Sequence, residues 1–274
     1  MTPKKLACAF AALFLASAAS AGAAEEEWRY RVGVHDFLVP DVNSHTYGFN
    51  AGLSLDKRAD GGGHFFGSVD VFRDFDRDHL DNDHIPIWWQ LHAGSDGDFW
   101  RADRMRLGWT ADVDTRINTV SSIERQITAL PALVGGYGGQ ILQASLEAGA
   151  GWFFLEIDDD APREQGYDRS GLRNSTFAYS AAAKATLKLG ESWAISGQAR
   201  GWWDSHRPLE NYYQAALRMD ANKWFGGGVM KQPAWVLSAD YYWYNLGVYN
   251  QANLPPVLRW NDDLMIRLSL EAKW

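Results

Sequence analysis

Apolar and polar residues alternate one by one along most of the chain, and the pattern is clearest in the last eleven residues. There the apolar residues and the polar residues occupy alternate positions: Leu264, Ile266, Leu268, Leu270, Ala272 and Trp274 on one face, Met265, Arg267, Ser269, Glu271 and Lys273 on the other. Successive side chains of a β-strand point to opposite faces, so this period of two predicts a strand with one apolar face. The sequence therefore predicts an all-β fold.

The alternation recurs about twelve times, and ten or fourteen strands are the alternatives. Pro131 weakens the sixth segment, because proline cannot donate a ladder hydrogen bond. The segment from Asn222 to Ala234 is long for a turn. The predicted strands are Trp28 to His35, Tyr47 to Leu55, His64 to Phe72, Ile87 to Ala93, Arg104 to Asp114, Ile127 to Val134, Leu142 to Phe154, Phe177 to Leu189, Trp193 to Trp203, Tyr213 to Ala221, Trp235 to Tyr244 and Leu264 to Trp274.

The connections between these segments alternate in length. Those after odd segments are long and polar, whereas most of those after even segments are short and rich in glycine, for example Gly94 to Asp98 and Gly135 to Gln140. Most of the segments are long enough for the roughly 9 to 11 residues that a tilted strand needs to cross a bilayer. These features predict an antiparallel up-and-down barrel with both termini on the same side.

The amino end has the three regions of a secretory signal. Lys4 and Lys5 precede an apolar run from Leu6 to Ala18, and small residues follow it, so we expect a signal over residues 1–21 with cleavage after Ala21 or Ala23. The mature chain, residues 25–274, is then one domain without cysteine, because Cys8 is the only one. We expect no metal site and no cofactor.

The charge of the mature chain is acidic. The chain has 26 basic and 34 acidic residues, and loss of Lys4 and Lys5 leaves 24 basic residues and a net charge near −10. This balance excludes nucleic acid as an expected partner.

A strand of this pattern that ends on an aromatic residue resembles the closing strand of Gram-negative outer-membrane β-barrels. In that class the segment is read by the barrel-assembly machinery, and Phe is usual where this chain has Trp274. The resemblance implies a transmembrane barrel in the outer membrane, periplasmic termini, contact with outer-membrane lipids and lipopolysaccharide, and recognition of Leu264 to Trp274 by that machinery.

The tryptophans on the apolar face indicate that this face points outward to lipid. They fall at both ends of the predicted strands, where an amphipathic ring can bury its body in acyl chain and keep its N–H among headgroups. The predicted interface residues are Trp28, Trp193, Trp235 and Trp274 at one end and Trp152, Trp203 and Trp243 at the other.

If the apolar face points outward, the charged face lines the lumen. The predicted lining comprises Arg29, Arg31, Arg104, Arg106, Arg200, Arg218, Arg267, Asp70, Asp112, Glu147, Asp220 and Asp240. This favours a passive channel, or porin, for small polar or anionic solutes. The same charges can instead form ion pairs between strands, which predicts a plugged, structural barrel.

Two further alternatives concern other activities. Ser44, His45 and Asn50, with His35 and Asp36, are candidates for a lipid hydrolase site. His35-Asp36 followed by Thr46-Tyr47-Gly48 is faintly similar to the opening of lipid A deacylase barrels, although His35 replaces Asn and the Tyr–Thr order is reversed. An autotransporter-like barrel without a passenger is the other alternative. The acidic segment Asp74 to His84 departs from a calcium loop, with His79 in place of Gly.

Overall fold

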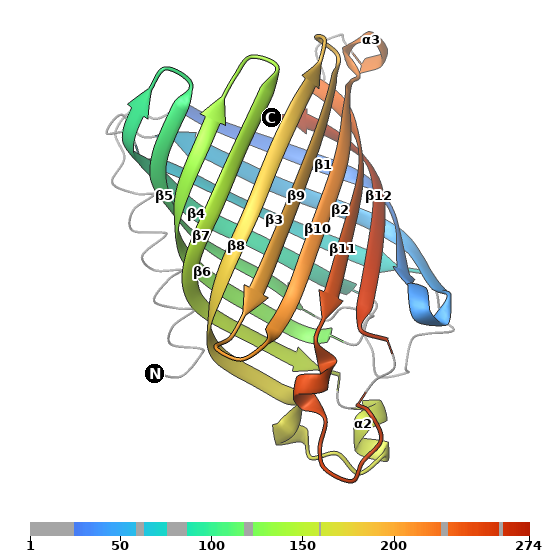
Figure 1. Cartoon of the computed structure of the whole chain (residues 1–274). Helices are drawn as coiled ribbons and strands as arrows, with labels where there is room; N and C mark the ends of the chain where they lie inside the picture. The colour runs from blue at the N-terminus through green and yellow to red at the C-terminus, as the bar shows by residue number, and fades with distance from the viewer. Residues whose placement is uncertain are drawn as a thin grey trace.

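Twelve antiparallel strands form one closed barrel (Figure 1). The computed structural model describes residues 25–58, 63–75, 87–117, 123–158, 160–225, 230–257 and 260–274. Every strand pairs with its neighbours in sequence, and β1 pairs with β12 to close the wall. The strands are β1 (Glu25–Val39), β2 (Ser44–Arg58), β3 (His64–Asp74), β4 (Ile87–Ala102), β5 (Met105–Ile117), β6 (Ile123–Gly138), β7 (Leu142–Ile157), β8 (Arg173–Leu189), β9 (Trp193–Trp203), β10 (Pro208–Asp220), β11 (Lys231–Tyr244) and β12 (Asp262–Lys273).

The two ends of the barrel differ. What we call the turn end carries the start of β1, the end of β12, the β4–β5, β6–β7 and β8–β9 turns, and the short helix α3 (Asn222–Phe225). The loop end carries the other short helices, η1 (Pro40–Val42), α2 (Asp160–Glu164), η2 (Arg169–Leu172) and η3 (Leu246–Tyr249). The predicted strand number and the predicted up-and-down order are confirmed. The predicted signal lies outside the described residues.

The fourth strand is longer than its sequence pattern predicts. We expected a turn from Gly94 to Asp98, but β4 continues to Ala102 with a register shift between Asp98 and Trp100. Gly94 lies within the strand, and a Cβ at this position would come within 2.5 Å of the Phe66 ring. Glycine here makes room for a large neighbour inside the sheet. The turn itself is at Asp103, whose φ of 49° is left-handed.

The sixth strand exists in spite of its proline. Pro131 points to the outside of β6, and the β6–β7 ladder lacks partners for Leu130 and Pro131 between the pairs Ala129–Trp152 and Ala132–Gly149. The residue of β7 that lies opposite is Gly149, and a Cβ at this position would come within 2.3 Å of the Pro131 carbonyl oxygen. A local gap in the ladder, opposite glycine, therefore lets a closed sheet contain proline.

The outward face of the barrel is apolar. Leu133, Leu146 and Phe177 are 66%, 69% and 64% exposed on it, and long rows of apolar side chains surround them. Many charged side chains of the strands lie on the inward face instead, among them Asp112, Arg200 and Arg267, which are buried. A closed sheet with an apolar outer face and a charged inner face is typical of a barrel that spans a membrane. Over the described residues, no helix is long and apolar enough to cross a membrane.

Arginine in place of Leu268 tests this assignment. Leu268 is 46% exposed on the outward face, near the middle of β12. We expect Leu268→Arg to lower the free energy of unfolding in lipid vesicles by about 2 to 4 kcal/mol, because the charge would enter hydrocarbon. Equilibrium denaturant unfolding measures this loss. Tyr47→Arg, near the loop end, is the control and should cost about 0 to 1 kcal/mol; an equal cost at both positions would contradict the lipid-facing assignment.

Candidate functional site: the barrel lumen

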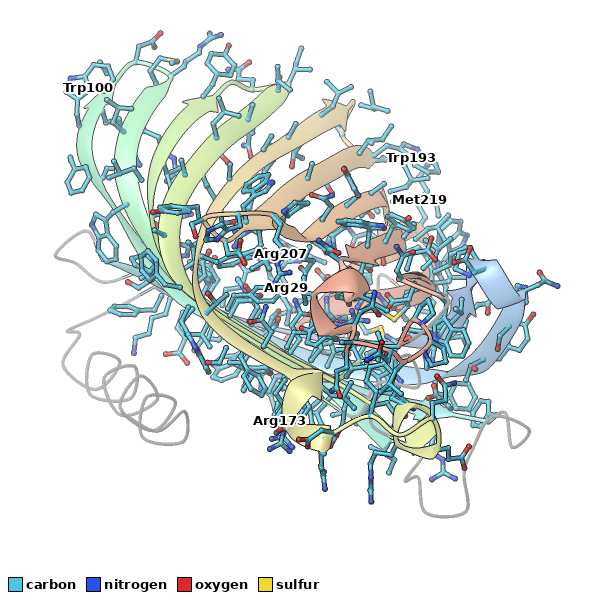
Figure 2. The ribbon with its side chains drawn as sticks, turned by 60° about the horizontal axis from the view of Figure 1, so that its bottom comes forward. Arg29, Trp100, Arg173, Trp193, Arg207 and Met219 are labelled. Atoms are coloured by element: carbon cyan, nitrogen blue, oxygen red, sulfur yellow. The ribbon has the colours of Figure 1, made fainter. Side chains whose placement is uncertain are left out.

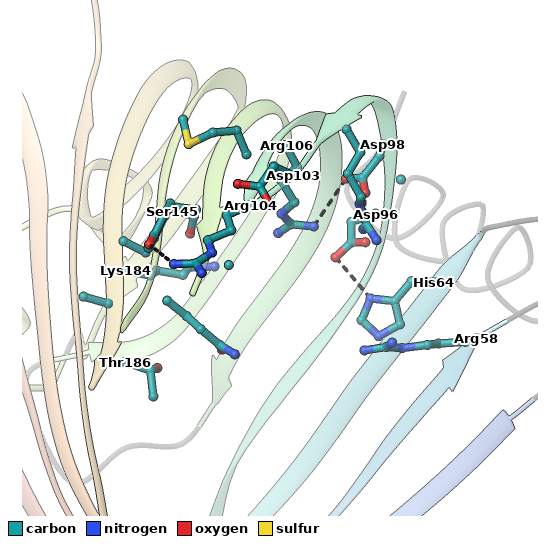
Figure 3. A pocket seen from close by; sticks show the side chains of 18 of the residues that line it. Arg58, His64, Asp96, Asp98, Asp103, Arg104, Arg106, Ser145, Lys184 and Thr186 are labelled. Carbon is teal, nitrogen blue, oxygen red and sulfur yellow. Dashed lines mark hydrogen bonds and ion pairs between the residues drawn. The ribbon is translucent and has the colours of Figure 1, made fainter. Parts of the chain in front are cut away.

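The lumen has a wide vestibule at the turn end. This hollow has a volume of about 700 Å³, and its wall carries more basic than acidic side chains. Figure 3 shows Arg104, Arg106 and Lys184 directed toward it from the β4–β5 side and from β8. Arg106 Nη1 lies 3.5 Å from Asp98, and His64 Nδ1 lies 3.1 Å from Asp96. Among the described side chains, the Tyr137 hydroxyl, at 3.4 Å, is the only hydrogen-bond partner of the Arg104 side chain.

A second, smaller cavity of about 290 Å³ lies deeper in the lumen. Lys184 lines both spaces, so the two spaces adjoin at this residue, and we call the second space the central cavity. Its wall combines charged side chains, amides and aromatic rings: Arg31, Asp70, His92, Asp114, Arg116, Lys184, Arg200, Glu210, Asp240 and Arg267, with Gln90, Gln126, Gln198, Gln214, Trp202, Tyr212 and Tyr242 among others.

The charges around the central cavity are paired across strands. Arg267 Nη2 donates to Asp240 at 2.7 Å, and Tyr212 and Gln214 donate to the same carboxylate at 2.7 Å each. Arg31 pairs with Asp70 through two nitrogens. Such pairs satisfy charges that would otherwise be costly to bury, and they also tie distant strands together.

A second group of pairs lies on the other side of the cavity. Arg200 Nη2 donates to Glu147 at 2.8 Å and lies 3.5 Å from Asp112, while Lys184 Nζ lies 2.6 Å from Glu147. His92 Nδ1 lies 2.6 Å from Asp114. Among the residues that the structure describes, Arg200 Nε and Nη1 have no hydrogen-bond partner. The donor capacity of Arg200 is therefore not fully used by the protein.

Apolar side chains close the lumen at the loop end. The larger cluster fills it from β6 to β11 and includes Phe153, Leu155 and Trp202 from the strands. Loop residues complete it, namely Tyr167, Leu172, Leu246, Tyr249 and Val257. Figure 2, seen from this end, shows the segment between β11 and β12 in front of the lumen. We call this cluster the seal.

A smaller cluster closes the opposite half of the loop end. Phe37, Phe72, Trp88 and Met265 are almost completely buried there, and the Phe72 and Trp88 rings stack with centroids 3.8 Å apart. Beneath them, His35 Nε2 lies 2.7 Å from Asp74, which also accepts from the Trp88 indole at 3.3 Å. The lumen is thus filled on both halves at this end over the described part of the chain.

Arg116 lies under the seal and links several strands. Its guanidinium lies 3.9 Å from the centre of the Tyr242 ring, and it donates to the Tyr244 hydroxyl and, at 3.4 Å, to Asp263. A guanidinium over an aromatic face gains cation–π attraction, which is stronger away from water. Arg116 therefore stabilises the boundary between the polar cavity and the apolar seal.

The loops that complete the seal are ordered by their own hydrogen bonds. The Tyr167 hydroxyl donates to the Pro255 carbonyl oxygen, and Gln251 Nε2 donates to the Asp168 carbonyl oxygen at 3.1 Å, so the β7–β8 and β11–β12 loops are joined. The Ser170 N–H donates to the Asp168 carboxylate at 3.0 Å and lowers the pKa of this exposed group. The seal depends on this contact between two loops.

At the turn end, ion pairs fill the half of the mouth opposite the vestibule. Glu271 accepts from Arg29 at 2.8 Å and from Arg218 at 2.7 Å, and Glu27 Oε2 lies 2.6 Å from Lys273 Nζ. These residues come from β1, β10 and β12. These pairs tie β1, β10 and β12 together at the turn end, away from the vestibule.

Most of the predicted lining residues lie on the inward face. Two lie at the ends of strands instead: Arg104 lies in the β4–β5 turn beside the vestibule, one residue before β5 begins, and Asp220 is the last residue of β10, where it accepts from the Asn222 N–H at 2.7 Å. The other ten are Arg29, Arg31, Arg106, Arg200, Arg218, Arg267, Asp70, Asp112, Glu147 and Asp240.

Sequence reasoning missed two central residues. Arg116 and Glu210 lie outside the predicted strands, yet both are on strands and almost completely buried. Each continues the period of two of its strand: Arg116 follows Asp112 and Asp114, and Glu210 precedes Tyr212. Extending the alternation past the first polar residues would have found them.

The five hydrolase candidates do not converge. His35 faces the lumen, whereas Asp36 is next to it on the strand and faces outward, where it lies 3.1 Å from His45 Nδ1. Asn50 faces the lumen and donates to Ser269 at 3.2 Å. Because Ser44 and Asn50 are six residues apart on β2, they are separated by roughly 20 Å. No nucleophile–histidine–carboxylate arrangement results from these residues in the described chain.

The predicted interface tryptophans all lie on the outward face. Trp28, Trp193 and Trp274 are exposed at the turn end, and Trp203 is exposed at the loop end. Their contact with headgroups stays a prediction. Over the described residues, no group of three or more His, Cys, Asp or Glu side chains could hold a metal ion. Most of the acidic segment Asp74 to His84 lies outside these residues.

Removing one partner of a buried pair should destabilise the barrel. Arg267 and Asp240 have side chains 10% and 4% exposed, so Arg267→Met leaves a buried carboxylate without its counter-charge. We expect a loss of about 3 to 5 kcal/mol in unfolding free energy, and a smaller loss when Asp240→Leu is added. Arg58→Met is the control, because the Arg58–Asp56 pair is exposed, and it should cost less than about 1 kcal/mol. A double variant no better than Arg267→Met would contradict the pairing.

Comparison with known proteins identifies no family. No family profile matches the chain, and no curated protein matches its sequence. Solved structures with a similar fold include OmpF of Salmonella typhi, with 8% identity, a TM-score of 0.41 and coverage of 92% of this chain and 97% of that chain. Another is the anion-selective porin of Comamonas acidovorans, with 7% identity, a TM-score of 0.37 and coverage of 92% and 99%. A third is the translocator domain of the autotransporter NalP from Neisseria meningitidis, with 10% identity, a TM-score of 0.39 and coverage of 98% and 96%.

Proposed function

We propose that the protein is a narrow passive channel for small polar solutes in the outer membrane of a Gram-negative bacterium. The observation that carries this proposal is the pair of polar spaces in series, the vestibule and the central cavity, which share Lys184. They lead from an open end into the middle of the membrane-spanning wall. In the usual orientation of such barrels the turn end, with both termini, faces the periplasm.

The seal at the loop end is the gate in this proposal. Five of its buried residues come from loops rather than from the barrel wall. Loops open at lower free energy than the strands of a continuous sheet, since fewer backbone hydrogen bonds hold them. Movement of the β7–β8 and β11–β12 loops would therefore connect the central cavity to the outside without breaking the barrel.

The paired charges favour weak selectivity by charge. Arg29, Arg31, Arg200, Arg218 and Arg267 each contact at least one carboxylate. A paired arginine presents little net field to a passing anion, so size and hydrogen bonding would select the solute more than its sign. This narrows the expected solute class from small polar or anionic solutes to small polar solutes.

Loosening the seal should increase conductance. Leu246 and Tyr249 are both 4% exposed within the seal, and replacing both with alanine removes apolar contacts that exist only when the loops are closed. We expect the double variant to raise the ratio of open to closed channels by about tenfold or more in planar bilayers. Leu146→Ala on the lipid-facing wall is the matched control and should leave the current unchanged. Wild-type and double-variant proteins that are both silent would contradict the channel.

Neutralising Lys184 should change the charge preference of the current. Lys184 lies where the vestibule and the central cavity adjoin and pairs with Glu147, so Lys184→Gln leaves excess negative charge at this place. We expect the reversal potential in a salt gradient to shift toward cation preference. Lys188→Gln is the control, because Lys188 is exposed near the turn end, and its shift should be smaller. Equal shifts would show that Lys184 does not control the charge preference.

A further inference from the structure

Two glutamine side chains in the central cavity have unused hydrogen-bonding capacity. Gln90 on β4 and Gln198 on β9 both line the cavity, and neither amide has a side-chain partner within the described part of the chain. Four strands lie between β4 and β9 on one side of the closed wall and six on the other, so the two amides approach the cavity from nearly opposite sides. An amide can donate and accept at once. The cavity therefore offers a ligand hydrogen-bond donors and acceptors from two opposite sides.

Other groups in the wall repeat this mixture of donors and acceptors. Arg200, which is 8% exposed, keeps two nitrogens without a partner, and Gln126 has an unpartnered carbonyl oxygen among the described residues. Trp202, Tyr212 and Tyr242 add aromatic rings to the same wall. A polar ligand with an apolar edge suits such a wall, because rings can cover carbon while amides bind oxygen.

The charge of the wall does not call for a charged ligand. Five basic residues line the cavity, namely Arg31, Arg116, Lys184, Arg200 and Arg267, against four acidic residues, Asp70, Asp114, Glu210 and Asp240. Asp112, Glu147 and Asp263 contact these basic groups from behind. An anion entering this cavity would lose hydration without gaining an uncompensated positive charge. A neutral molecule loses less hydration free energy on entering the cavity.

From these observations we infer that the central cavity is a binding site for a neutral, hydroxyl-rich solute of monosaccharide size. Hydroxyl groups donate and accept, as the free amides do. The volume of about 290 Å³ is at the lower end of the range for small-molecule sites. This assignment deepens the proposed function and rests on it only for transport, because binding itself requires no current.

The test is saturation-transfer NMR on the full chain in detergent, with methyl glucoside as the neutral probe and glucose 6-phosphate as the anionic probe. We expect saturation transfer to methyl glucoside and little to the phosphate. Gln198→Leu, which keeps the size of the side chain and removes its hydrogen bonds, should weaken binding of methyl glucoside by about tenfold. Binding of the phosphate alone, or of neither probe, would overturn the site.

A matched control separates the central cavity from the rest of the lumen. Gln143 also faces inward but lines the vestibule, so Gln143→Leu should leave binding unchanged. Equal weakening by both variants would overturn the assignment to the central cavity. Because native barrels migrate differently from unfolded chains in gels, heat modifiability confirms that each variant is folded. Binding without current would contradict the channel alone, whereas current without binding would contradict this site alone.

Discussion

The requirement that every backbone N–H and C=O find a partner in the absence of water determines most of this structure. A membrane-spanning sheet can meet it only by closing on itself, and the pairing of β1 with β12 provides that closure. Closure also sorts the side chains, since one face of each strand then meets lipid and the other meets the lumen. The charged residues are therefore collected in a confined space, where they must pair or be hydrated. In this structure the confined space is occupied by ion pairs and by the apolar seal, and two polar cavities remain between them.

Sequence alternation predicts the wall well because the wall has a single repeating constraint. The period of two places Leu268 outside and Arg267 inside without knowledge of any neighbour, and the structure agrees at both positions. It fails at strand ends, where glycine and polar residues indicate a turn although the strand continues, as at Gly94. Arg116 and Glu210 lie near the loop ends of their strands, so for the same reason the sequence pattern did not reveal these two central residues of the lumen.

The filling of the lumen was not predictable for a different reason. Whether Arg267 pairs with Asp240, or Arg31 with Asp70, depends on register between strands and on the tilt of the wall. Neither quantity is encoded in a local pattern. The contact between Tyr167 and Pro255 joins residues 88 positions apart, and no periodicity of the sequence predicts it. The sequence therefore predicts most of the charged residues of the lumen, while only the three-dimensional arrangement shows how they pair.

The composition of the seal has a consequence for how the barrel is assembled. Its residues come from strands and loops that range from Ile123 to Val257, so most of the second half of the chain must be in place before these side chains can meet. Until then the interior has no dry layer, and water can occupy it from both sides. Hairpins entering the bilayer one after another would thus surround a wet interior whose charges stay hydrated. Exclusion of water from the loop end would then be a late event, following the docking of the last strand against the first.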